Sequence, residues 1–518
     1  MKKLLLLCVA IFCLTAAGCG FFETPDYTPD PEDVIGTPGA TVKPPESTPV
    51  EGGTLKCAVA VYNTLNPLST NSEDIKYYMS LVFEPMLNLD IEQKLVPCLC
   101  ESWECSEDGL KWTFHMRSGI NWQDGQPLSC GDFKSTVDWI KNNGGIYKTN
   151  VQNIVSCNVL SDSEFEINLK VRDGFLPNKM IFPILRNGQE LTTGTGMYSL
   201  ESDSESSIVL SKNLNWWGTE KPHIDRIEIS KMSNEDEKCA ASSDLTFLFD
   251  NYVQKYSFKD GCKLYTNQGR IFTMMAVNNA NIPDANLRIA LCYIIDKVNV
   301  LNSSVSGRGL STDWPVYPGT VYWRDGSVYY LKNTKLAEDH MNAAGYTKNA
   351  DGWYKDGVGP LIFTLTCPNT VELAACADSI KKQFENFGIG LNVAVESSLQ
   401  SADSKYRSGQ YTLGLMQLNL STWPDIQDIV TSGGSLNFFK YSDQTVDSLL
   451  ADIDSLDTAS QCDRMSQVQT KLNEDEPFIG LYIRGDAISV SSSLVGPGNT
   501  GVTVWNPFWA FSRWYIKG

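Results

Sequence analysis

The sequence predicts an α/β fold, because segments with strand periodicity alternate with segments with helix periodicity. Apolar and polar residues alternate in "TLKCAVAVY", 54–62, which indicates a strand. "NLRIALCYIIDKVNVL", 286–301, predicts a single amphipathic helix. The apolar stripe of this helix consists of Leu287, Leu291, Ile294 and Val298. "LAACADSIKKQFENFGIGLNVAV", 373–395, predicts a helix that ends at Gly388 and is followed at once by a strand.

Shorter elements lie between the first strand and the long helices. Ser72 is a typical N-cap, and apolar residues follow it at helical spacing, so we expect a helix there. Its apolar residues are Ile75, Tyr78, Met79 and Val82. "KWTFHM", 111–116, alternates and predicts a strand, and "QDGQP", 123–127, has the composition of a tight turn. Ser129 and Asp132 have the spacing of a capping box at the start of another helix.

The beginning of the sequence has the pattern of a bacterial secretion signal. Lys2 and Lys3 are followed by an apolar run over 4–14 and by small residues before Cys19. A membrane-spanning helix needs about 20 apolar residues, so we interpret 1–18 as a signal peptide. "TAAGC" resembles a lipobox, in which Cys19 becomes the lipid-modified first residue of the mature protein. An ordinary cleaved signal is the alternative.

Residues 19–53 are rich in Pro, Thr, Glu and Asp and contain few residues that could form a core. A segment of this composition cannot bury enough apolar surface to offset the conformational entropy lost on folding. We therefore interpret 19–53 as a lipid-anchored, disordered linker. A chain of this length would hold a domain on the order of 30 Å from its anchor.

Composition narrows the classes of partner. The formal net charge of −19 argues against nucleic acid and against electrostatic binding to anionic lipid. Of the 15 cysteines, Cys8, Cys13 and Cys19 belong to the signal and anchor. The others are scattered without zinc-ribbon spacing. We interpret them as small buried thiols, with disulfides as the alternative.

The residues form no recognisable catalytic pattern. The 3 histidines, His115, His223 and His340, are isolated in the sequence, and no His-x-x-x-His or His-Glu-x-x-His occurs. The sequence also lacks Gly-x-Ser-x-Gly. His115 has apolar neighbours on its predicted strand, so a structural role is expected. We therefore expect a protein that is not an enzyme and that needs no cofactor or metal.

The stretch "VPCLCESWECSEDGLKWTFHMRSGINWQDGQPLSCGDF", 96–133, resembles the signature of family 5 extracytoplasmic solute-binding proteins. These are the oligopeptide-, dipeptide- and nickel-binding components of ABC importers. The matching positions are Phe114, His115, Arg117, Gly119, Trp122, Asp124, Gly125 and Pro127. Further segments that resemble the family follow in its order, at 194–200, 212–229, 277–297, 337–346, 351–354, 437–450 and 472–482.

This resemblance implies a two-lobed, periplasmic-binding-protein-like fold with a hinge between the lobes. The first lobe would comprise 54–267, with a large accessory subdomain at about 76–190. The second lobe would comprise 268–482, and 483–518 would return to the first. The lobes would close over a solute, as periplasmic binding proteins do.

The resemblance also places a ligand segment. In the peptide binders of the family, an aspartate in "W-x-x-D-Y" pairs with the α-ammonium of the peptide. The corresponding stretch here is "LMQLNLSTWPDIQD", 415–428, where Thr422 stands at the aspartate position if Trp423 replaces the Tyr. A shift of one residue would place Ser421 there instead. Asp425 matches a second carboxylate of the pattern. Since neither hydroxyl carries a charge, a blocked peptide, a glycopeptide, a sugar or another neutral solute is expected.

Candidate ligand-binding residues come from four segments. They are Tyr62, Asn63, Thr64, Met275, Trp314, Ser421, Thr422, Trp423 and Asp425. Two alternatives stay open: the tryptophans could be core aromatics of a lobe, and Asp425 could cap the helix after it.

The expected function is that of a lipoprotein on the outer face of the cell membrane, or in the periplasm. It would capture a peptide, a peptide-like compound or a neutral solute as a monomer. Its partners would be the permease and ATPase subunits of an ABC importer. Use of the same fold as a ligand sensor or cell-surface binding protein in signalling is the alternative.

Overall fold

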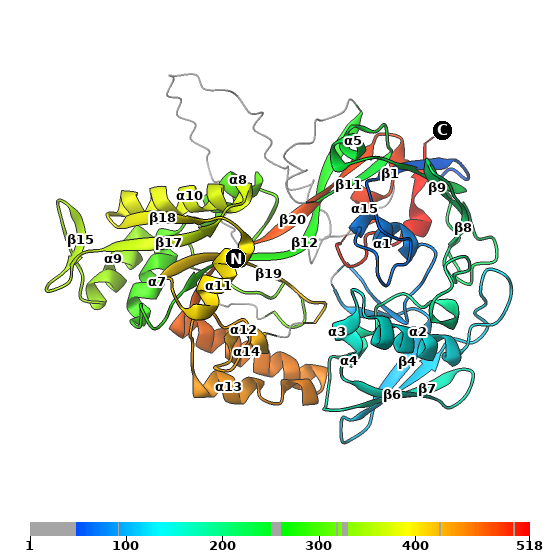
Figure 1. Cartoon of the computed structure of the whole chain (residues 1–518), viewed down its shortest axis with the longest axis horizontal. Helices are drawn as coiled ribbons and strands as arrows, with labels where there is room; N and C mark the ends of the chain where they lie inside the picture. Colours follow the sequence, from blue (N-terminus) through cyan, green and yellow to red (C-terminus); the bar gives the residue numbers. More distant parts are fainter. Residues whose placement is uncertain are drawn as a thin grey trace, which may run out of the picture.

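A computed structural model describes residues 48–91, 93–249, 261–317, 320–323, 330–423, 426–500 and 503–517. It has two lobes that lie side by side (Figure 1). Lobe 1 contains the blue and cyan segments and the red C-terminal segment, and lobe 2 contains most of the green, yellow and orange ones. The molecule is therefore a mixed α/β protein with two bodies, as the sequence predicts.

One large sheet runs through both lobes. Within the described residues it has 11 strands, in the order β18-β17-β19-β12-β20-β11-β1-β10-β9-β8, with β13 paired to β20. The strands in that order are β18 Gly390–Glu396, β17 Ile362–Pro368, β19 Leu413–Asn419, β12 Cys262–Val277, β20 Phe478–Ser491, β11 Leu245–Leu248, β1 Thr54–Val59, β10 Arg226–Lys231, β9 Ser207–Lys212, β8 Tyr198–Asp203 and β13 Gly309–Ser311.

The two longest strands, β12 and β20, connect the lobes. They are antiparallel, and their register shifts between Asn267 and Ile271, where they pass from one lobe to the other. The two backbones approach closely there, because a Cβ added at Gly269 would lie 1.9 Å from the carbonyl oxygen of Arg484. This irregular stretch, where Gly269 permits a close backbone contact, is a suitable hinge.

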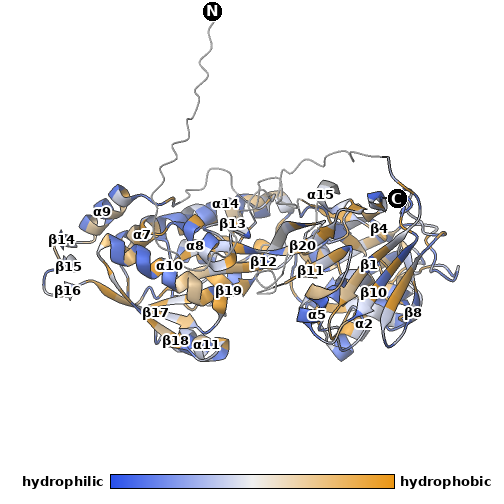
Figure 2. Ribbon diagram, turned by 90° about the horizontal axis from the view of Figure 1, so that it is seen from above, coloured by the Kyte–Doolittle hydropathy of each residue, from blue (hydrophilic) through white to orange (hydrophobic). Residues whose placement is uncertain are grey.

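The core of lobe 1 forms around β1, which pairs in parallel with β10 and β11. Helix α1, Glu73–Ser80, packs against it and begins where Ser72 Oγ accepts a hydrogen bond of 3.3 Å from Ile75 N. Figure 2 shows apolar residues concentrated on strands such as β1 and β10, whereas polar residues colour outlying helices such as α11, Leu399–Ser408.

A separate four-stranded sheet with α2 forms an accessory part of lobe 1. Its strands, in the order of pairing, are β4 Cys100–Cys105, β5 Lys111–Met116, β7 Glu164–Leu169 and β6 Ile154–Val159, and α2 is Cys130–Asn143. Phe165 packs between Phe114 at 5.2 Å and Phe133 at 4.3 Å, which joins the sheet to α2. His115 is half-buried in β5 and lies opposite Glu164, a scaffold position.

In lobe 2, β17, α10 and β18 form the expected helix–strand unit. Helix α10, Val371–Phe387, ends at Gly388, whose φ of 97° is in the left-handed region that favours glycine. The prediction of one helix over 286–301 is wrong. The chain forms α7, Ala285–Ile294, and α8, Lys297–Val305, because Asp296 caps α8 through Asn299 N at 3.0 Å. Val298 is 56% exposed and does not belong to the stripe.

A second cluster of buried residues in lobe 2 lies under α13, Gln444–Leu450, and α14, Thr458–Asp475. It includes Trp314, Phe439 and Phe478. It also includes Phe175, a residue that the sequence assigns to lobe 1. The two lobes therefore share this cluster at one point.

The remaining elements are short. The strands are β2 Leu87–Leu89, β3 Leu95–Pro97, β14 Thr347–Asn349, β15 Gly352–Lys355, β16 Gly359–Pro360, β21 Leu494–Val495 and β22 Tyr515–Ile516. The helices and turns are α3 Lys148–Val151, α4 Leu176–Lys179, η2 Arg186–Gly188, α5 Glu235–Ala240, α9 Thr334–Ala343, α12 Gln427–Val430, η3 Ile453–Ser455, α15 Pro497–Thr500 and η4 Phe511–Arg513.

Cysteines in the described ranges are present as free thiols. They are Cys57, Cys98, Cys100, Cys105, Cys130, Cys157, Cys239, Cys262, Cys292, Cys367, Cys376 and Cys462. Burial raises the pKa of Cys57 and Cys292, so these thiols stay protonated. A search of the described residues finds no helix with the length and apolar content needed to cross a bilayer.

Candidate functional site

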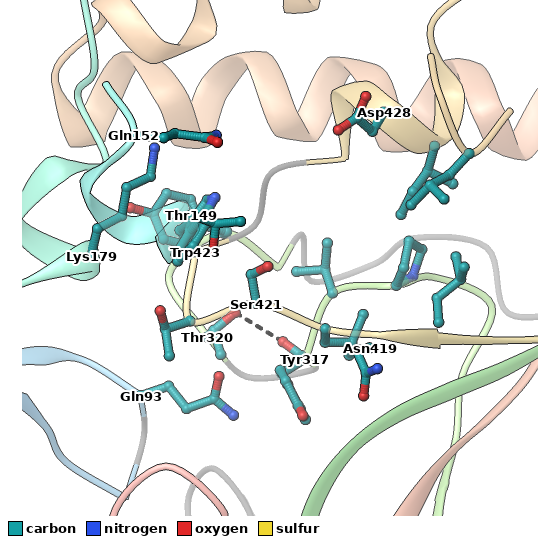
Figure 3. Close-up of a pocket in the computed structure, with 18 residues that line it drawn as sticks. Gln93, Thr149, Gln152, Lys179, Tyr317, Thr320, Asn419, Ser421, Trp423 and Asp428 are labelled. Atoms are coloured by element: carbon teal, nitrogen blue, oxygen red, sulfur yellow. Dashed lines mark hydrogen bonds between the residues drawn. The ribbon is translucent and has the colours of Figure 1, made fainter. Parts of the chain in front are cut away.

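The candidate site is a cavity of about 310 Å³ between the lobes. Lobe 1 contributes Gln93, Thr149, Gln152 and Lys179 to its lining. Lobe 2 contributes 14 residues: Pro315, Val316, Tyr317, Thr320, Tyr322, Leu418, Asn419, Leu420, Ser421, Thr422, Trp423, Asp428, Ile429 and Leu436. Figure 3 shows Lys179, Gln152 and Thr149 on one side of Trp423, with Ser421, Thr320 and Tyr317 on the other. Such a cavity exists only while both lobes face each other.

Strand β19 delivers the main ligand segment. Its burial makes β19 a rigid central strand, and the chain leaves it after Asn419. Leu420 N still donates to Arg270 O of the hinge region at 2.8 Å, which fixes the direction of the following residues. Ser421, Thr422 and Trp423 therefore enter the cavity from a defined position.

A second wall comes from the segment after β13. The Tyr317 hydroxyl donates to the backbone carbonyl of Gly269 in the hinge, and Thr320 Oγ1 donates to Tyr317 O at 2.9 Å (Figure 3). Burial raises the pKa of Tyr317 and of Tyr322, so both hydroxyls stay protonated. This wall thus presents aromatic rings held by neutral hydrogen bonds.

Among the described lining residues, Lys179 and Asp428 carry a charge. Lys179 Nζ lies 2.6 Å from Asp173 Oδ2, and Asp173 is 3% exposed, so the ammonium is already neutralised. The same ammonium lies 5.0 Å from the centre of the Trp423 ring, a cation–π contact between the lobes. Asp428 is exposed and accepts from Ser435 N at 3.3 Å. The cavity therefore offers mainly hydroxyl, amide and aromatic groups.

Residues 173–179, which we call the latch segment, contact lobe 2 next to the cavity, and Lys179 lines it. Thr422 Oγ1 donates to Asn178 O at 3.1 Å, and Asn178 Nδ2 donates to Thr422 O at 3.4 Å. Gly174 N donates to Asp454 O of lobe 2. Phe175 is 0% exposed and lies edge-on to Tyr322 at 5.9 Å. A short segment of lobe 1 thus makes polar and apolar contacts with lobe 2.

On the hinge side, Arg270 Nη2 lies 2.6 Å from Glu73 Oε1 of lobe 1. Burial alone would raise the pKa of Glu73, but the Lys76 ammonium and the Arg270 guanidinium lower it below its ordinary value. The carboxylate is therefore ionised at neutral pH and holds the base of α1 against β12.

The structure brings together three of the predicted site residues. Ser421, Thr422 and Trp423 all line the inter-lobe cavity. Asp425 lies outside the described residues, as does Cys19.

Tyr62, Asn63 and Thr64 do not line this cavity. Asn63 N donates to Asn71 Oδ1 at 3.1 Å and its own side-chain oxygen accepts from Asn71 N at 2.8 Å, which closes the loop after β1. Thr64 Oγ1 accepts from Asn66 N at 3.1 Å, and the Tyr62 ring lies 5.4 Å from Lys231 Nζ. Local loop structure accounts for these polar groups.

The predictions for Met275 and Trp314 are wrong in this structure. Met275 is 0% exposed in the core of lobe 2, where β12 places it between Leu415 and Ile479 on the neighbouring strands. Trp314 is 2% exposed and lies edge-on to Phe478 at 5.8 Å. Both side chains serve as core residues because large apolar groups gain most from full burial.

Sequence reasoning missed the lobe 1 wall and Tyr317. Gln93, Thr149 and Gln152 lie in short polar stretches without periodicity, so no local signal indicated them. Tyr317 lies three residues after Trp314 in "STDWPVYPG". The predicted segment therefore contributes to the cavity wall through Tyr317 and not through Trp314.

Comparison with protein families matches residues 94–439 to the bacterial extracellular solute-binding proteins, family 5, middle region. This match covers more than half of the chain. The chain belongs to this family. It is accordingly an extracellular solute-binding protein.

Relatives of this family 5 protein bind different solutes. The nickel-binding periplasmic protein of Escherichia coli K12 is 24% identical over 367 residues, which is 65% of this chain and 69% of that protein. The periplasmic oligopeptide-binding protein OppA of Salmonella typhimurium is 22% identical over 491 residues, which is 82% and 85%.

Solved structures show the same fold. The unliganded open form of the periplasmic murein tripeptide-binding protein MppA superposes with a TM-score of 0.77 at 18% identity, and the match covers 91% of this chain and 99% of that one. Identity at this level shows the fold and leaves the solute undetermined.

Proposed function

We propose that this protein captures a peptide, a peptide-like compound or a neutral solute between its lobes and delivers it to an ABC importer. The observation that carries the proposal is the cavity of about 310 Å³ lined by residues of both lobes. A solute there would contact both bodies at once and would stabilise the closed arrangement. The permease and ATPase subunits would then receive the loaded protein.

The lining supports a small solute without a net charge. The volume is at the lower end of the range for small-molecule pockets, which is about 300–1,000 Å³. Ser421 and Thr149 offer hydroxyls, Gln152 and Asn419 offer amides, and the charge of Lys179 is already matched by Asp173. Each neutral hydrogen bond would contribute about 1 kcal/mol. The aromatic rings would supply the remaining affinity.

The absence of an aspartate at Thr422 supports a solute without a free amino terminus. Thr422 instead uses its hydroxyl to bind the backbone of Asn178 across the cleft. Its role in this structure is to join the lobes. A blocked peptide, a glycopeptide or a sugar would fit this arrangement.

We also propose the lobe boundaries 267/268 and 482/483, which fall within the connecting strands β12 and β20. An accessory subdomain at about 76–190, a monomeric state and a lipid on Cys19 complete the proposal. The lipid would keep the protein at the outer face of the membrane.

The first experiment identifies the solute and then removes one wall. Mass spectrometry of compounds that co-purify with residues 53–518 supplies the candidate, and calorimetry measures its affinity. Trp423→Ala should weaken binding by roughly 30-fold or more, because a central aromatic contact contributes about 2 kcal/mol. The melting temperature without solute should stay the same, since Trp423 is only half-buried.

Trp139→Ala is the matched control, because Trp139 is a half-buried tryptophan of α2 that does not line the cavity. It should bind the solute with the affinity of the parent protein. Normal binding by Trp423→Ala would show that the solute site is elsewhere.

A further inference from the structure

A second cavity, of about 400 Å³, lies within lobe 1. Its described lining residues all fall in the ranges 76–217 and 505–512, so lobe 2 contributes none of them. They come from α1, from the stretch around β2 and β3, from 181–183 and from the C-terminal segment. This cavity is therefore separate from the inter-lobe cavity.

Four indole rings line this cavity. They belong to Trp216, Trp217, Trp505 and Trp509, and all four side chains are only half-buried. Indoles are large and mostly apolar, and their burial is strongly favourable. Rings that stay partly open to a cavity leave apolar surface in contact with water, which a ligand could cover.

Two of the rings are held in place before any ligand arrives. Glu84 Oε1 accepts from Trp216 Nε1 at 3.0 Å, and Glu84 Oε2 accepts from Trp217 Nε1 at 2.7 Å. Glu84 is 8% exposed, so water competes little for these bonds. A Cβ added at Gly218 would lie 2.2 Å from the Trp216 ring, so the close packing of this ring needs glycine. A rigid wall lowers the entropic cost of binding.

The charged groups of the cavity wall already have partners, which disfavours ions of either sign. Lys76, which lines the cavity, lies 3.3 Å from Glu73 Oε2. Both oxygens of Glu84 are used by the indoles, so they do not form a free counter-charge for a cation. Arg117 lies 5.5 Å from the Trp217 ring and Lys221 lies 5.8 Å from the Trp216 ring, so cation–π contacts on these rings are already made. An anion is disfavoured because it would lie close to the buried carboxyl of Glu84.

Trp505 separates the two cavities. It packs against the core of lobe 1 and also against the lobe 2 cluster that contains Tyr317. Tyr317 in turn lines the inter-lobe cavity. The lobe 1 cavity thus lies behind a residue that contacts both lobes.

We propose that the lobe 1 cavity is a second binding site, which takes an uncharged aromatic ring. The ring packs against the exposed parts of the indoles and displaces water from them. This proposal does not depend on which solute the inter-lobe cavity binds.

The test uses three probes that share one ring and differ in charge: benzyl alcohol, benzoate and benzylamine, each at about pH 7.5. Saturation-transfer NMR on the soluble protein should show millimolar binding of benzyl alcohol. Benzoate and benzylamine should bind roughly tenfold more weakly or not at all. Equal binding of all three probes, or no binding of benzyl alcohol, would overturn the proposal.

Two tryptophan substitutions locate the site. Asn88 lies in β2 and lines the lobe 1 cavity, whereas Ser421 lines the inter-lobe cavity. Asn88→Trp should abolish binding of benzyl alcohol, and Ser421→Trp should leave it unchanged. The opposite pattern would assign the probe to the inter-lobe cavity and would contradict the proposal, without bearing on the capture of solute there.

A direct measurement covers the case in which Asn88→Trp does not fold. Crystals of the parent protein soaked with a bromobenzyl alcohol should show an anomalous bromine peak between Trp216, Trp217 and Trp509. A bromine peak found only elsewhere would overturn the proposal.

Discussion

At the residue scale, Glu84 is a carboxyl group in an unusual environment. Burial raises its pKa to about 7, although the hydrogen bonds from Trp217 and Trp216 act in the opposite direction. The group therefore changes its protonation in the folded protein near neutral pH, well above the ordinary value of 4.5 for a glutamate. The two indole N–H groups favour the ionised form, so their hydrogen bonds to Glu84 are stronger above its pKa.

This shift predicts a pH dependence of stability. Since the folded pKa of Glu84, about 7, is above the ordinary value of 4.5, the folded state binds more protons between these values. The contribution of Glu84 is therefore greatest below about pH 4.5 and is lost as pH rises towards 7. The loss would be at most about 3 kcal/mol in the free energy of unfolding.

Urea denaturation at several pH values, between about 4.5 and 8, measures this effect. The unfolding free energy of the parent minus that of Glu84→Gln should decrease as pH rises, because only the parent loses stability when Glu84 ionises. Glu107→Gln changes an exposed carboxyl and should leave the pH profile of the parent unchanged. Parallel profiles for the parent and Glu84→Gln would show that Glu84 does not titrate in this range.

At the scale of elements, the latch segment shows how a short piece of chain connects two bodies. Residues 173–179 of the accessory part contact lobe 2, and Phe175 among them is completely buried in a cluster of that lobe. Gly174 makes this possible, because a Cβ at that position would lie 2.5 Å from Leu456 O. Because β12 and β20 connect the lobes without a break, the lobes can move relative to each other by rotation about these strands. Such a rotation forms or breaks the contact of the latch segment.

Phe175→Ala should open the lobes. Loss of the ring would remove about 3–5 kcal/mol of packing, and this loss would fall on the closed arrangement alone. Small-angle scattering should show a larger radius of gyration, and solute affinity should fall because the cavity forms less often.

Phe438→Ala is the control for this prediction. Phe438 belongs to the same buried cluster but comes from lobe 2 itself. Its truncation should lower the melting temperature and leave the radius of gyration of the folded protein unchanged. An unchanged radius in Phe175→Ala would mean that the latch segment does not hold the lobes together.

At the scale of the whole molecule, one sheet extends through both lobes, while each lobe has its own buried core. The lobes can therefore rotate about β12 and β20 while these two cores stay intact, and the part that opens is the lobe 2 cluster that holds Phe175. Arg270 and Glu73 form an ion pair across the hinge, and the latch segment makes the contact on the opposite side. A solute can therefore enter when the latch segment separates from lobe 2, while the ion pair between Arg270 and Glu73 stays formed.

The anchor is also a property of the whole molecule. We expect the full-length protein to partition into detergent, because acyl chains on Cys19 would each contribute about 0.8 kcal/mol per buried CH₂. Cys19→Ala should partition into water, and residues 53–518 should do the same. Partition of Cys19→Ala into detergent would exclude the lipid on this residue.

Local structure was predicted well where a short-range signal exists. Ser72 caps α1, Ser129 and Asp132 form the capping box of α2, and Gly388 ends α10, as the sequence indicates. These features depend on hydrogen bonds within a few residues. The break at Asp296 was missed because the apolar spacing of 286–301 continues through it. In the structure Asp296 caps a new helix and ends the helical run.

The lining of the inter-lobe cavity was predicted only in part, and the reason is physical. Ser421 to Trp423 were found because the resemblance to the family placed this segment at the cleft. Met275 and Trp314 are in the right segments, but tertiary packing buries them. Gln93, Thr149 and Gln152 reach the cavity only because the accessory part folds against lobe 2, and no local pattern encodes that contact.

The sequence by itself determined the α/β class, the ends of helices such as α1, α2 and α10, and the membership of a solute-binding family, since these depend on near neighbours and on the order of motifs along the chain. The tertiary structure alone decided which side chains face the cavity, that the latch segment joins the lobes, and that four tryptophans from distant segments line a second cavity. Such placements depend on contacts between residues hundreds of positions apart, as between Asn178 and Thr422. Only the folded chain brings them together.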